Sequence, residues 1–417
     1  MAKGKLNCAI DVGSTKITTL VSMVGEEDDK HHIIGASTSS SRGIRKGQIV
    51  NIDEAVDSIV ESVEAAERMA GYNIGKVWVS IDGAHIISQN SQGVVAVSNQ
   101  HGEIVPDDVH RVIEAARAVS LPTSSEILHV IPRSYTVDNQ QGIKDPIGMT
   151  GVRLEVETHI VTASTTAVKN LSKCIGEVGC DISGMAFSGL VSSLAILTDT
   201  EKELGVICLD IGGGTTDIVI YVDGAVAYSS VLPVGAKNVT NDLAIGLRIS
   251  LESAEKIKLT LGNFKPHDKE DEVDLSSFSL PEEIKTASYK TLVEGIIRPR
   301  LNELFQAVAT EVKKSGLAGL TPAGLVICGG GALTVGIVES AKRILGMPVR
   351  VGYPIGITGL IDEIENPAFA ASVGLLKYSL LSAQSSESSF QISHILDKFP
   401  KLGILGKVSD MLKSLLP

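Results

Sequence analysis

The 417-residue chain has a formal net charge of −12, and hydrophobic residues make up 43% of it and charged residues 21%. This length suits two to four domains, each with a core of its own. A general nucleic-acid binder shows a basic excess, so the acidic balance excludes that class and we expect no nucleic acid among the partners. No apolar run in the sequence reaches the roughly 18 residues that a membrane-spanning helix needs.

The chain up to residue 83 is expected to form three strands, a helix and a fourth strand. The three strands lie within residues 6–36. Asn51 or Asp53 caps the helix, whose apolar residues recur at helical spacing. The fourth strand is Val77–Ile81, an apolar run typical of a parallel strand that is buried on both faces.

The first chemical motif lies between the first two of these strands. An apolar strand ends near Asp11, and a second strand follows a short polar turn. The turn residues are Gly13, Ser14, Thr15 and Lys16. A glycine leaves backbone N–H groups open to an anion because no Cβ blocks the approach, and the hydroxyls add donors. A Walker A loop is excluded, since that loop enters a helix and this turn enters a strand.

The pattern of expected helices and strands changes in residues 84–164. The expected elements are a strand at 86–97, a helix at 106–119, strands at 126–137 and 152–163, and a loop at 138–150. We interpret this segment as an inserted small α+β domain without a nucleotide motif. An enlarged connection without a partner is the alternative.

The turn motif recurs in residues 206–220. A buried apolar strand ends near Asp210, and a β-branched strand follows the turn. The turn residues are Gly212, Gly213, Gly214, Thr215 and Thr216. Either turn alone could be a plain glycine-rich hairpin with a polar tip. Two such units, each with an aspartate before its turn, indicate two related domains that face one nucleotide.

The remaining globular part is expected to be mainly helical. Helices are predicted at 234–243, 250–261, 288–315, 332–345 and 367–381, a loop or hairpin at 263–280, and a strand at 324–328. Pro299 should kink or divide the long helix. The strand leads into a third glycine-rich turn, which contains Gly329, Gly330, Gly331 and Ala332.

The three turns resemble the two phosphate motifs and the adenosine motif of the actin, Hsp70 and sugar-kinase superfamily. Within this superfamily, the chain resembles the FtsA family of bacterial cell-division proteins over essentially its whole length. The resemblance lies in the length of the chain, the residues of the three motifs and the C-terminal tail. The resemblance implies an α/β, actin-like two-domain ATPase fold with an inserted small α+β subdomain and a C-terminal amphipathic helix. It also implies ATP and Mg²⁺ as cofactors, with Asp11 and Asp210 holding the metal through water.

The resemblance further assigns nucleotide contacts to the three turns and to Gly235 and Lys237 at the start of the following helix. In Hsp70, a glutamate and a lysine three residues apart contact the ribose, which implies this role for Glu255 and Lys258. An ordinary ion pair on one helix face is the alternative.

The same resemblance implies a domain order. The first actin-like domain takes residues 1–83, 165–197 and 367–382, with the inserted subdomain at 84–164; the second takes 198–233 and 316–366, with its smaller lobe at 234–315; a flexible linker covers 383–402 and an amphipathic helix 403–417. The tail of FtsZ is expected on the smaller lobe, where Arg298 and Arg300 could pair with its acidic residues. Pairing with Glu294 and Glu303 along the helix is the alternative.

The C-terminal helix has one apolar face and one basic and polar face. The apolar face contains Ile404, Leu405, Val408, Met411, Leu412, Leu415 and Leu416. A basic amphipathic helix after a serine-rich linker fits a membrane interface, where anionic lipids attract lysines. A helix docked on the body of the protein is the alternative.

The expected function is therefore that of an ATP-binding protein that polymerises on itself at the inner face of the cell membrane at the division site. It would tether FtsZ filaments there and recruit late division proteins such as FtsN through the inserted subdomain. Other actin-like cytoskeletal or pilus-assembly ATPases are the close alternative, and a sugar-kinase-type phosphotransferase is a more distant one.

We expect weak or no ATPase activity and assign no catalytic residue. In Hsp70 and some relatives, the stretch that matches Ser188–Leu194 begins with a Glu-Pro pair near the γ-phosphate. Here the matching positions are Gly189 and Leu190, whose side chains accept no proton. An acid from a neighbouring loop, such as Glu201 or Glu203, is the alternative.

Overall fold

The computed structural model describes residues 5–25, 30–99, 101–263, 271–276, 281, 286–360 and 364–382. The chain divides into two compact units, Met1–Tyr378 and Ser379–Pro417. The expected linker at 383–402 and the amphipathic helix at 403–417 lie outside the described residues. Among the described helices, none combines the length and the apolar character that crossing a bilayer requires.

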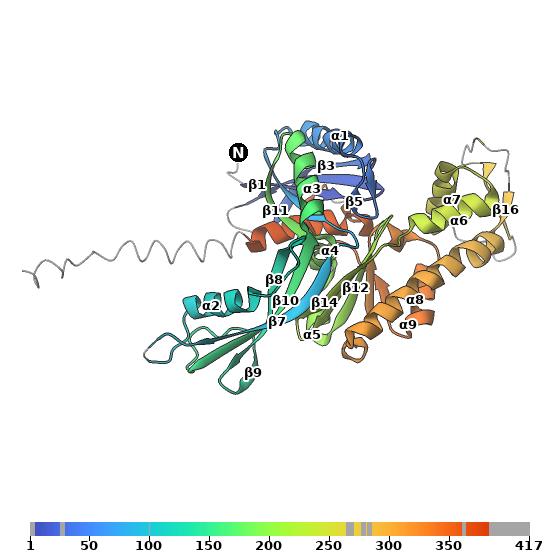
Figure 1. Ribbon diagram of the computed structural model, residues 1–417. Helices are drawn as coiled ribbons and strands as arrows, with labels where there is room; N and C mark the ends of the chain where they lie inside the picture. Colours follow the sequence, from blue (N-terminus) through green and yellow to red (C-terminus); the bar gives the residue numbers. More distant parts are fainter. Residues whose placement is uncertain are drawn as a thin grey trace, which may run out of the picture. The chain divides into compact units, whose positions relative to one another are not determined.

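The first of two large sheets has six strands in the order β11-β6-β1-β2-β3-β19 (Figure 1). These are β1 (Lys5–Val12), β2 (Lys16–Val24), β3 (His31–Ser40), β6 (Lys76–Ile81), β11 (Asp181–Phe187) and β19 (Ile357–Gly359). β1, β2 and β3 are antiparallel, whereas β6 runs parallel to β1 and β11 parallel to β6. Helices α1 (Ile52–Ala70) and α3 (Thr165–Glu177) pack side by side near this sheet. The expected strands and the first helix, which Asn51 caps, are confirmed.

The second large sheet repeats this plan in the order β14-β13-β12-β17-β18. Its strands are β12 (Val206–Ile211), β13 (Thr216–Val222), β14 (Ala225–Leu232), β17 (Leu325–Cys328) and β18 (Val349–Val351). β12, β13 and β14 are antiparallel, and β17 runs parallel to β12. The two phosphate motifs therefore lie at equivalent places, between the first and second strands of each unit. The expected repeat of a related domain is confirmed.

The smaller lobe of the second half is mainly helical. It contains α6 (Lys237–Leu247), α7 (Leu251–Asn263), β15 (Glu272–Asp274), β16 (Thr286–Ser288), the π-helix η2 (Thr291–Ile297) and α8 (Arg298–Ser315). Pro299 has no N–H to offer to the turn before it. The N–H of Arg298 bonds to the carbonyl of Val293, which is the wider π-helical spacing. The long helix therefore changes from π to α geometry at the proline, as expected of a dividing residue.

The inserted segment forms an α+β unit with its own small core. Its elements are β7 (Ile87–Ala96), α2 (Pro106–Arg117), β8 (Ser125–Val137), β9 (Gln140–Ile143) and β10 (Arg153–Ser164), in the sheet order β7-β10-β8-β9. The expected loop at 138–150 is wrong in part, because it contains β9. Gln140, Gln141 and Gly142 have little strand propensity, but pairing with β8 and burial of Ile143 in the small core outweigh that propensity.

Two buried histidines join the inserted unit to both large sheets. His129 Nε2 accepts a hydrogen bond from the N–H of Phe187 in β11 at 2.9 Å. His159 lies 2.8 Å from Asn90 Oδ1 and 2.8 Å from Ser229 Oγ in β14. Burial lowers the pKa of His129 to about 3 and that of His159 to about 4. Both rings are therefore neutral at pH 7, and their hydrogen bonds need no charge.

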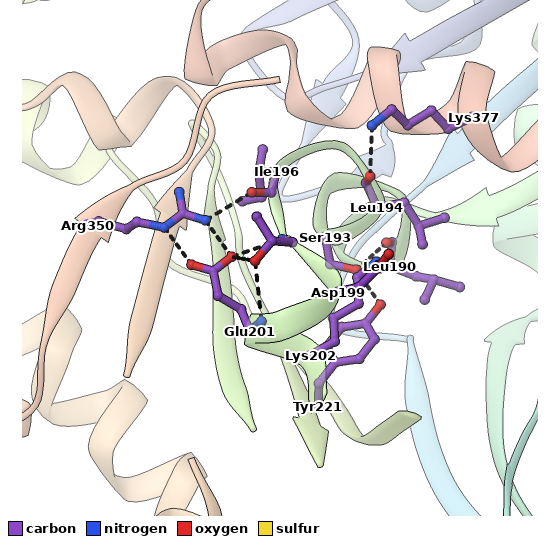
Figure 2. A network of polar contacts seen from close by, with 11 residues as sticks. Leu190, Ser193, Leu194, Ile196, Asp199, Glu201, Lys202, Tyr221, Arg350 and Lys377 are labelled. Carbon is purple, nitrogen blue, oxygen red and sulfur yellow. Dashed lines mark hydrogen bonds and ion pairs between the residues drawn. The ribbon is translucent and has the colours of Figure 1, made fainter. Parts of the chain in front are cut away.

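Helix α4 (Ser188–Ile196) is buried along almost its whole length and contacts strands of both large sheets. Figure 2 shows two cations at its C-terminal end: Arg350 Nη2 donates to the carbonyl of Ile196 at 3.0 Å, and Lys377 Nζ to that of Leu194 at 3.2 Å. The last carbonyls of a helix lack partners within the helix and carry partial negative charge. Both contacts therefore stabilise the end of α4.

Arg350 also anchors the short helix α5 (Asp199–Leu204), through which the chain passes from α4 to β12. Its Nε and Nη2 lie 2.7 and 2.8 Å from the two carboxylate oxygens of Glu201 (Figure 2). Hydrogen bonds from Arg350 are the main reason that the pKa of Glu201 falls to about 2. This bidentate pair fixes the connection between the halves to the sheet-edge strand β18.

Replacing Glu201 with Gln should lower the free energy of unfolding by about 1 kcal/mol at pH 7, because a charge-assisted pair is lost. The folded-state pKa lies below the unfolded value of about 4.3, so the contribution is present above that pH and is lost as the pH falls towards 2. Urea unfolding of variant and wild type should therefore differ at pH 7 and converge in acid. Asp199→Asn removes only an exposed pair with Lys202 and should change nothing measurable. Equal losses in both variants would contradict this account.

Candidate nucleotide site

The turn that contains Gly13, Ser14, Thr15 and Lys16, named here the first phosphate turn, lies between β1 and β2. The N–H of Gly13 bonds to the carbonyl of Lys16 at 3.1 Å, and a Cβ on Gly13 would lie 2.7 Å from that oxygen. Ser14 Oγ accepts from the N–H of Gly47 at 2.8 Å. The turn therefore requires a glycine at its start and is held on its outer side by the segment between β4 (Ile44–Arg45) and β5 (Gln48–Ile49).

The second phosphate turn closes in the same way between β12 and β13. The N–H of Gly212 bonds to the carbonyl of Thr215 at 2.9 Å. A Cβ on Gly213 would lie 2.2 Å from Thr15 Cγ2, and a Cβ on Gly214 would lie 2.7 Å from Ser14 Oγ. The two turns are therefore in contact, and only glycines allow this approach.

The third turn follows β17. Gly329 has a φ of 79°, and a Cβ there would lie 2.2 Å from Asp210 Oδ1. The 3₁₀ helix η4 (Gly330–Leu333) comes next, and α9 (Ile337–Leu345) begins only after Gly336. The expected start of this helix at residue 332 is wrong, because Gly336 has a left-handed φ of 76° that interrupts helical geometry.

The three turns line a cleft of about 730 Å³, a volume typical of small-molecule sites. Predicted nucleotide contacts that line it are Asp11, Gly13, Ser14, Thr15, Lys16, Asp210, Gly212, Gly213, Thr215, Lys237, Glu255, Lys258, Gly329, Gly330 and Gly331. Gly214, Thr216, Gly235 and Ala332 are not among the lining residues of the described chain. The Thr216 hydroxyl, for example, donates to the carbonyl of Val234 behind the turn at 2.9 Å.

Glu255 and Lys258 line the cleft and also form an ion pair. Lys258 Nζ donates to Glu255 Oε2 at 2.7 Å and to Thr240 Oγ1 at 3.0 Å, and the Thr240 hydroxyl donates to Glu255 at 2.5 Å. Lys258 is 6% exposed, whereas the Glu255 side chain is 43% exposed. The ion-pair alternative is thus present in the structure. It does not exclude a ribose contact, because the pair faces the cleft.

Four aspartates and one lysine form a group of charged side chains in the lining of the cleft. They are Asp11, Asp82, Asp210, Asp217 and Lys16. Burial raises the pKa of Asp210 to about 7 and raises those of Asp11 and Asp217. Burial lowers the pKa of Lys16, whose Nζ lies 4.0 Å from the ring centre of Phe369. Glu252 and Glu255 bring the acidic side chains that line the cleft to six, against the four lysines Lys16, Lys237, Lys256 and Lys258, so acidic side chains are in excess.

A divalent cation would offset the excess of acidic side chains in the cleft. Within the described ranges, no group of three or more His, Cys, Asp or Glu side chains is arranged to hold a metal by itself. Mg²⁺ with nucleotide phosphates keeps several of its waters, so contact through water suits this donor set. Asp217 Oδ1 is buried and has no hydrogen-bond partner among the described residues, a position that a metal-bound water would satisfy. Asp11, Asp210 and Asp217 are therefore the residues that would hold the ion.

Two protein-family models match this chain. The family model described as "Cell division protein FtsA" matches residues 207–374, and that of the "SHS2 domain inserted in FTSA" matches residues 83–162. The chain is 39% identical over 394 residues to the cell division protein FtsA of Pseudomonas aeruginosa, which covers 94% of this chain and 93% of that one. The chain belongs to the FtsA family. Its identity to FtsA of Escherichia coli K12 is 34% over 398 residues, with 93% of each chain covered.

Solved structures show the fold of this FtsA-family chain. The PilM–PilN type IV pilus biogenesis complex aligns with a TM-score of 0.63 at 16% identity, over 89% of this chain and 98% of that one. MreB5 of Spiroplasma citri bound to ADP aligns with a TM-score of 0.55 at 15% identity, over 92% and 98%. The expected α/β, actin-like fold with an inserted α+β subdomain is confirmed.

Sequence reasoning about this FtsA-family chain missed two of the four cleft aspartates. Asp217 belongs to the second motif, but the sequence pattern places it only in the strand that follows the turn. Asp82 directly follows β6, and the register that pairs Ile10 with Val79 brings it level with the first phosphate turn. The signal was available, since ligand sites lie at the carboxyl ends of parallel strands. Glu201 and Glu203 are not among the residues of the described chain that line the cleft.

The two arginines assigned to FtsZ both form ion pairs. Arg298 pairs with Glu294. Arg300 Nε and Nη2 lie 2.6 and 3.0 Å from the carboxylate oxygens of Asp242 in α6, and its Nη1 lies 2.6 Å from Glu303. The expected partners along the helix are therefore in place, and Asp242 is a further partner from a distant part of the chain. The role of both arginines towards FtsZ stays a prediction.

Gly213→Val should abolish nucleotide binding, because its side chain would push the second turn away from Thr15 and out of its anion-binding geometry. Isothermal titration calorimetry with Mg·ADP measures the loss. Gly176→Ala is the matched control, since the space around Gly176 in α3 is open, and it should bind as wild type does. Unchanged affinity in Gly213→Val would refute the placement of the phosphates.

Proposed function

We propose that this FtsA-family chain binds ATP and Mg²⁺ in the cleft between its two halves, polymerises at the inner face of the cell membrane and tethers FtsZ filaments at the division site. The observation that carries the nucleotide part is the contact between the two phosphate turns over a cleft that the third glycine turn also lines. Solved MreB5 structures bound to ADP and to AMPPNP support it, because they share the fold.

In this proposal, the amides of the first two turns bind the phosphates and those of Gly329–Gly331 lie against the adenosine. Glu255 and Lys258 contact the ribose, and Lys16 and Lys237 add positive charge to the phosphate end. Mg²⁺ supplies the charge that offsets the aspartates and the phosphates, and Asp11, Asp210 and Asp217 hold its water shell. Nucleotide then acts mainly to close the cleft between the halves.

Slow turnover is part of the proposal. Gly189 and Leu190 in α4 supply no carboxylate near Asp217, against which Gly189 packs so tightly that a Cβ would lie 2.7 Å from the Asp217 Cβ. Positioning of an attacking water contributes on the order of 10²–10⁴ in rate. A protein without that carboxylate in α4 binds ATP well and hydrolyses it slowly.

Family membership supports the cell-division role over another cytoskeletal or pilus-assembly ATPase and over a sugar kinase. The finer partners are part of this proposal: the C-terminal tail of FtsZ on the smaller lobe, late division proteins such as FtsN on the inserted unit, further copies of the chain in filaments, and anionic lipids at residues 403–417. Co-sedimentation with FtsZ and lipid vesicles, with and without Mg·ATP, tests the proposal that the protein tethers FtsZ to membranes. FtsZ that stays unbound to vesicles in the presence of the protein would refute the tethering role.

Arg300→Glu should weaken binding of an FtsZ tail peptide at least ten-fold, because a charge that pairs with acidic residues is reversed. The same change also breaks the pair with Asp242, so Asp242→Asn is the matched control. That variant breaks the same pair but keeps the positive charge of Arg300, which still pairs with Glu303, and it should bind the peptide at least as well as wild type. Fluorescence anisotropy with a labelled peptide measures both. Equal losses in the two variants would show that the arginine acts only in the fold.

Met411→Glu should abolish vesicle binding, because it places a charge on the apolar face of the helix that the sequence predicts at residues 403–417, and burying an unpaired charge costs several kcal/mol. Nucleotide binding should persist. Flotation with vesicles that contain anionic lipid measures the first property and calorimetry the second. Ser414→Glu changes the polar face of the same helix and should weaken flotation far less. A Met411→Glu protein that still floats would mean that the helix docks elsewhere.

A further inference from the structure

Asp82 is a carboxylate of the first half that reaches the phosphate turn of the second half. It follows β6 directly and lines the cleft together with Asp217 and Ser188. The Thr215 hydroxyl donates to Asp82 Oδ2 at 2.5 Å, although the two residues lie 133 positions apart. No role for Asp82 follows from the glycine turns, which bind phosphate without it.

The Asp82 carboxylate is held in a fixed orientation. One of its oxygens, Oδ1, accepts from the N–H of Gly83 at 2.5 Å, and Oδ2 accepts from Thr215. A side-chain hydrogen bond with Asp217 takes a third position on the carboxylate, which leaves one lone pair for another donor. Asp217 lies beside it: the charge of Asp82 adds to burial in raising the Asp217 pKa. A carboxylate with two donors already in place needs little reorganisation to receive a water molecule.

Other acids near the connection between the halves are engaged elsewhere. Glu201 is bound by Arg350, and Glu203 pairs with Lys144 of the inserted unit at 2.6 Å. Asp11 accepts from Ser80 at 2.7 Å and Asp210 accepts from Ser192, and both, like Asp217, are residues that would hold the metal ion. Of the cleft carboxylates, Asp82 is the one that the first half places directly against the hydroxyl of the second phosphate turn.

We propose that Asp82 is the catalytic carboxylate for the slow hydrolysis of ATP in this chain. It orients a water molecule and accepts its proton as the water oxygen bonds to the γ-phosphorus. The bond from the γ-phosphorus to the β,γ-bridging oxygen breaks, its electron pair leaves with ADP, and inorganic phosphate is the second product. This role rests on the proposed ATP binding. Asp82 and Thr215 come from different halves, so this geometry requires the two halves to be in contact.

The test compares full-length wild type, Asp82→Asn and Glu203→Gln on vesicles that contain anionic lipid. Asparagine keeps the shape of the side chain, and its amide can still bond to the Thr215 hydroxyl. Single-turnover phosphate release should fall at least 100-fold in Asp82→Asn, while the affinity for a non-hydrolysable ATP analogue changes less than about three-fold. Glu203→Gln removes an acid outside the cleft and should hydrolyse ATP at the wild-type rate.

A second variant separates chemistry from structure. In Asp82→Ala, added formate should restore part of the phosphate release, because a small carboxylate can enter the vacated space. If Asp82 only held the two halves together, formate would not restore phosphate release. Wild-type turnover in Asp82→Asn, absence of formate rescue, or a wild type that binds ATP without releasing phosphate would each overturn the assignment and leave ATP binding intact. A wild type that binds no nucleotide in calorimetry would instead overturn the proposed function itself.

Discussion

The contact between the two phosphate turns is the constraint on which the rest of this structure depends. Gly213 faces Thr15 and Gly214 faces Ser14 without room for a Cβ, so the two large sheets must present their turns to each other at fixed distance. Each sheet achieves this by the same means, an antiparallel pair of strands with an aspartate near the end of the first. The symmetry of the cleft follows from this repeat.

The same contact creates an electrostatic cost. Bringing the turns together also brings four aspartates together in one cleft, with Lys16 among them. Like charges at short range oppose closure. Hydroxyl donors from Ser80, Ser192 and Thr215 offset part of this repulsion, one for each of Asp11, Asp210 and Asp82. A cation bound with the phosphates would offset the remainder, which couples closure of the cleft to binding.

Sequence reasoning succeeded where structure is local. Each glycine turn is a continuous stretch whose chemistry can be read from neighbouring residues, and the helix capped by Asn51 carries its own signal. It failed where distant segments meet. Asp82 becomes a cleft residue only through the parallel pairing of β6 with β1, and Asp242 becomes the partner of Arg300 only through the packing of α6 against α8. Strand β9 likewise forms because β8 is there to pair with it, against the propensity of its own residues.

Several side-chain hydrogen bonds hold the segments that connect the two halves. Ser192 of α4 donates to Asp210 in the cleft, while the C-terminal carbonyls of the same helix are held by Arg350 of β18 and by Lys377. The inserted unit adds a second bridge, through His129 to β11 and through His159 to Ser229 in β14. Both rings are neutral at pH 7, so these bonds persist at that pH. Relative motion of the two halves must therefore strain α4 or the inserted unit, and whatever binds the inserted unit acts on an element joined to both sides of the cleft.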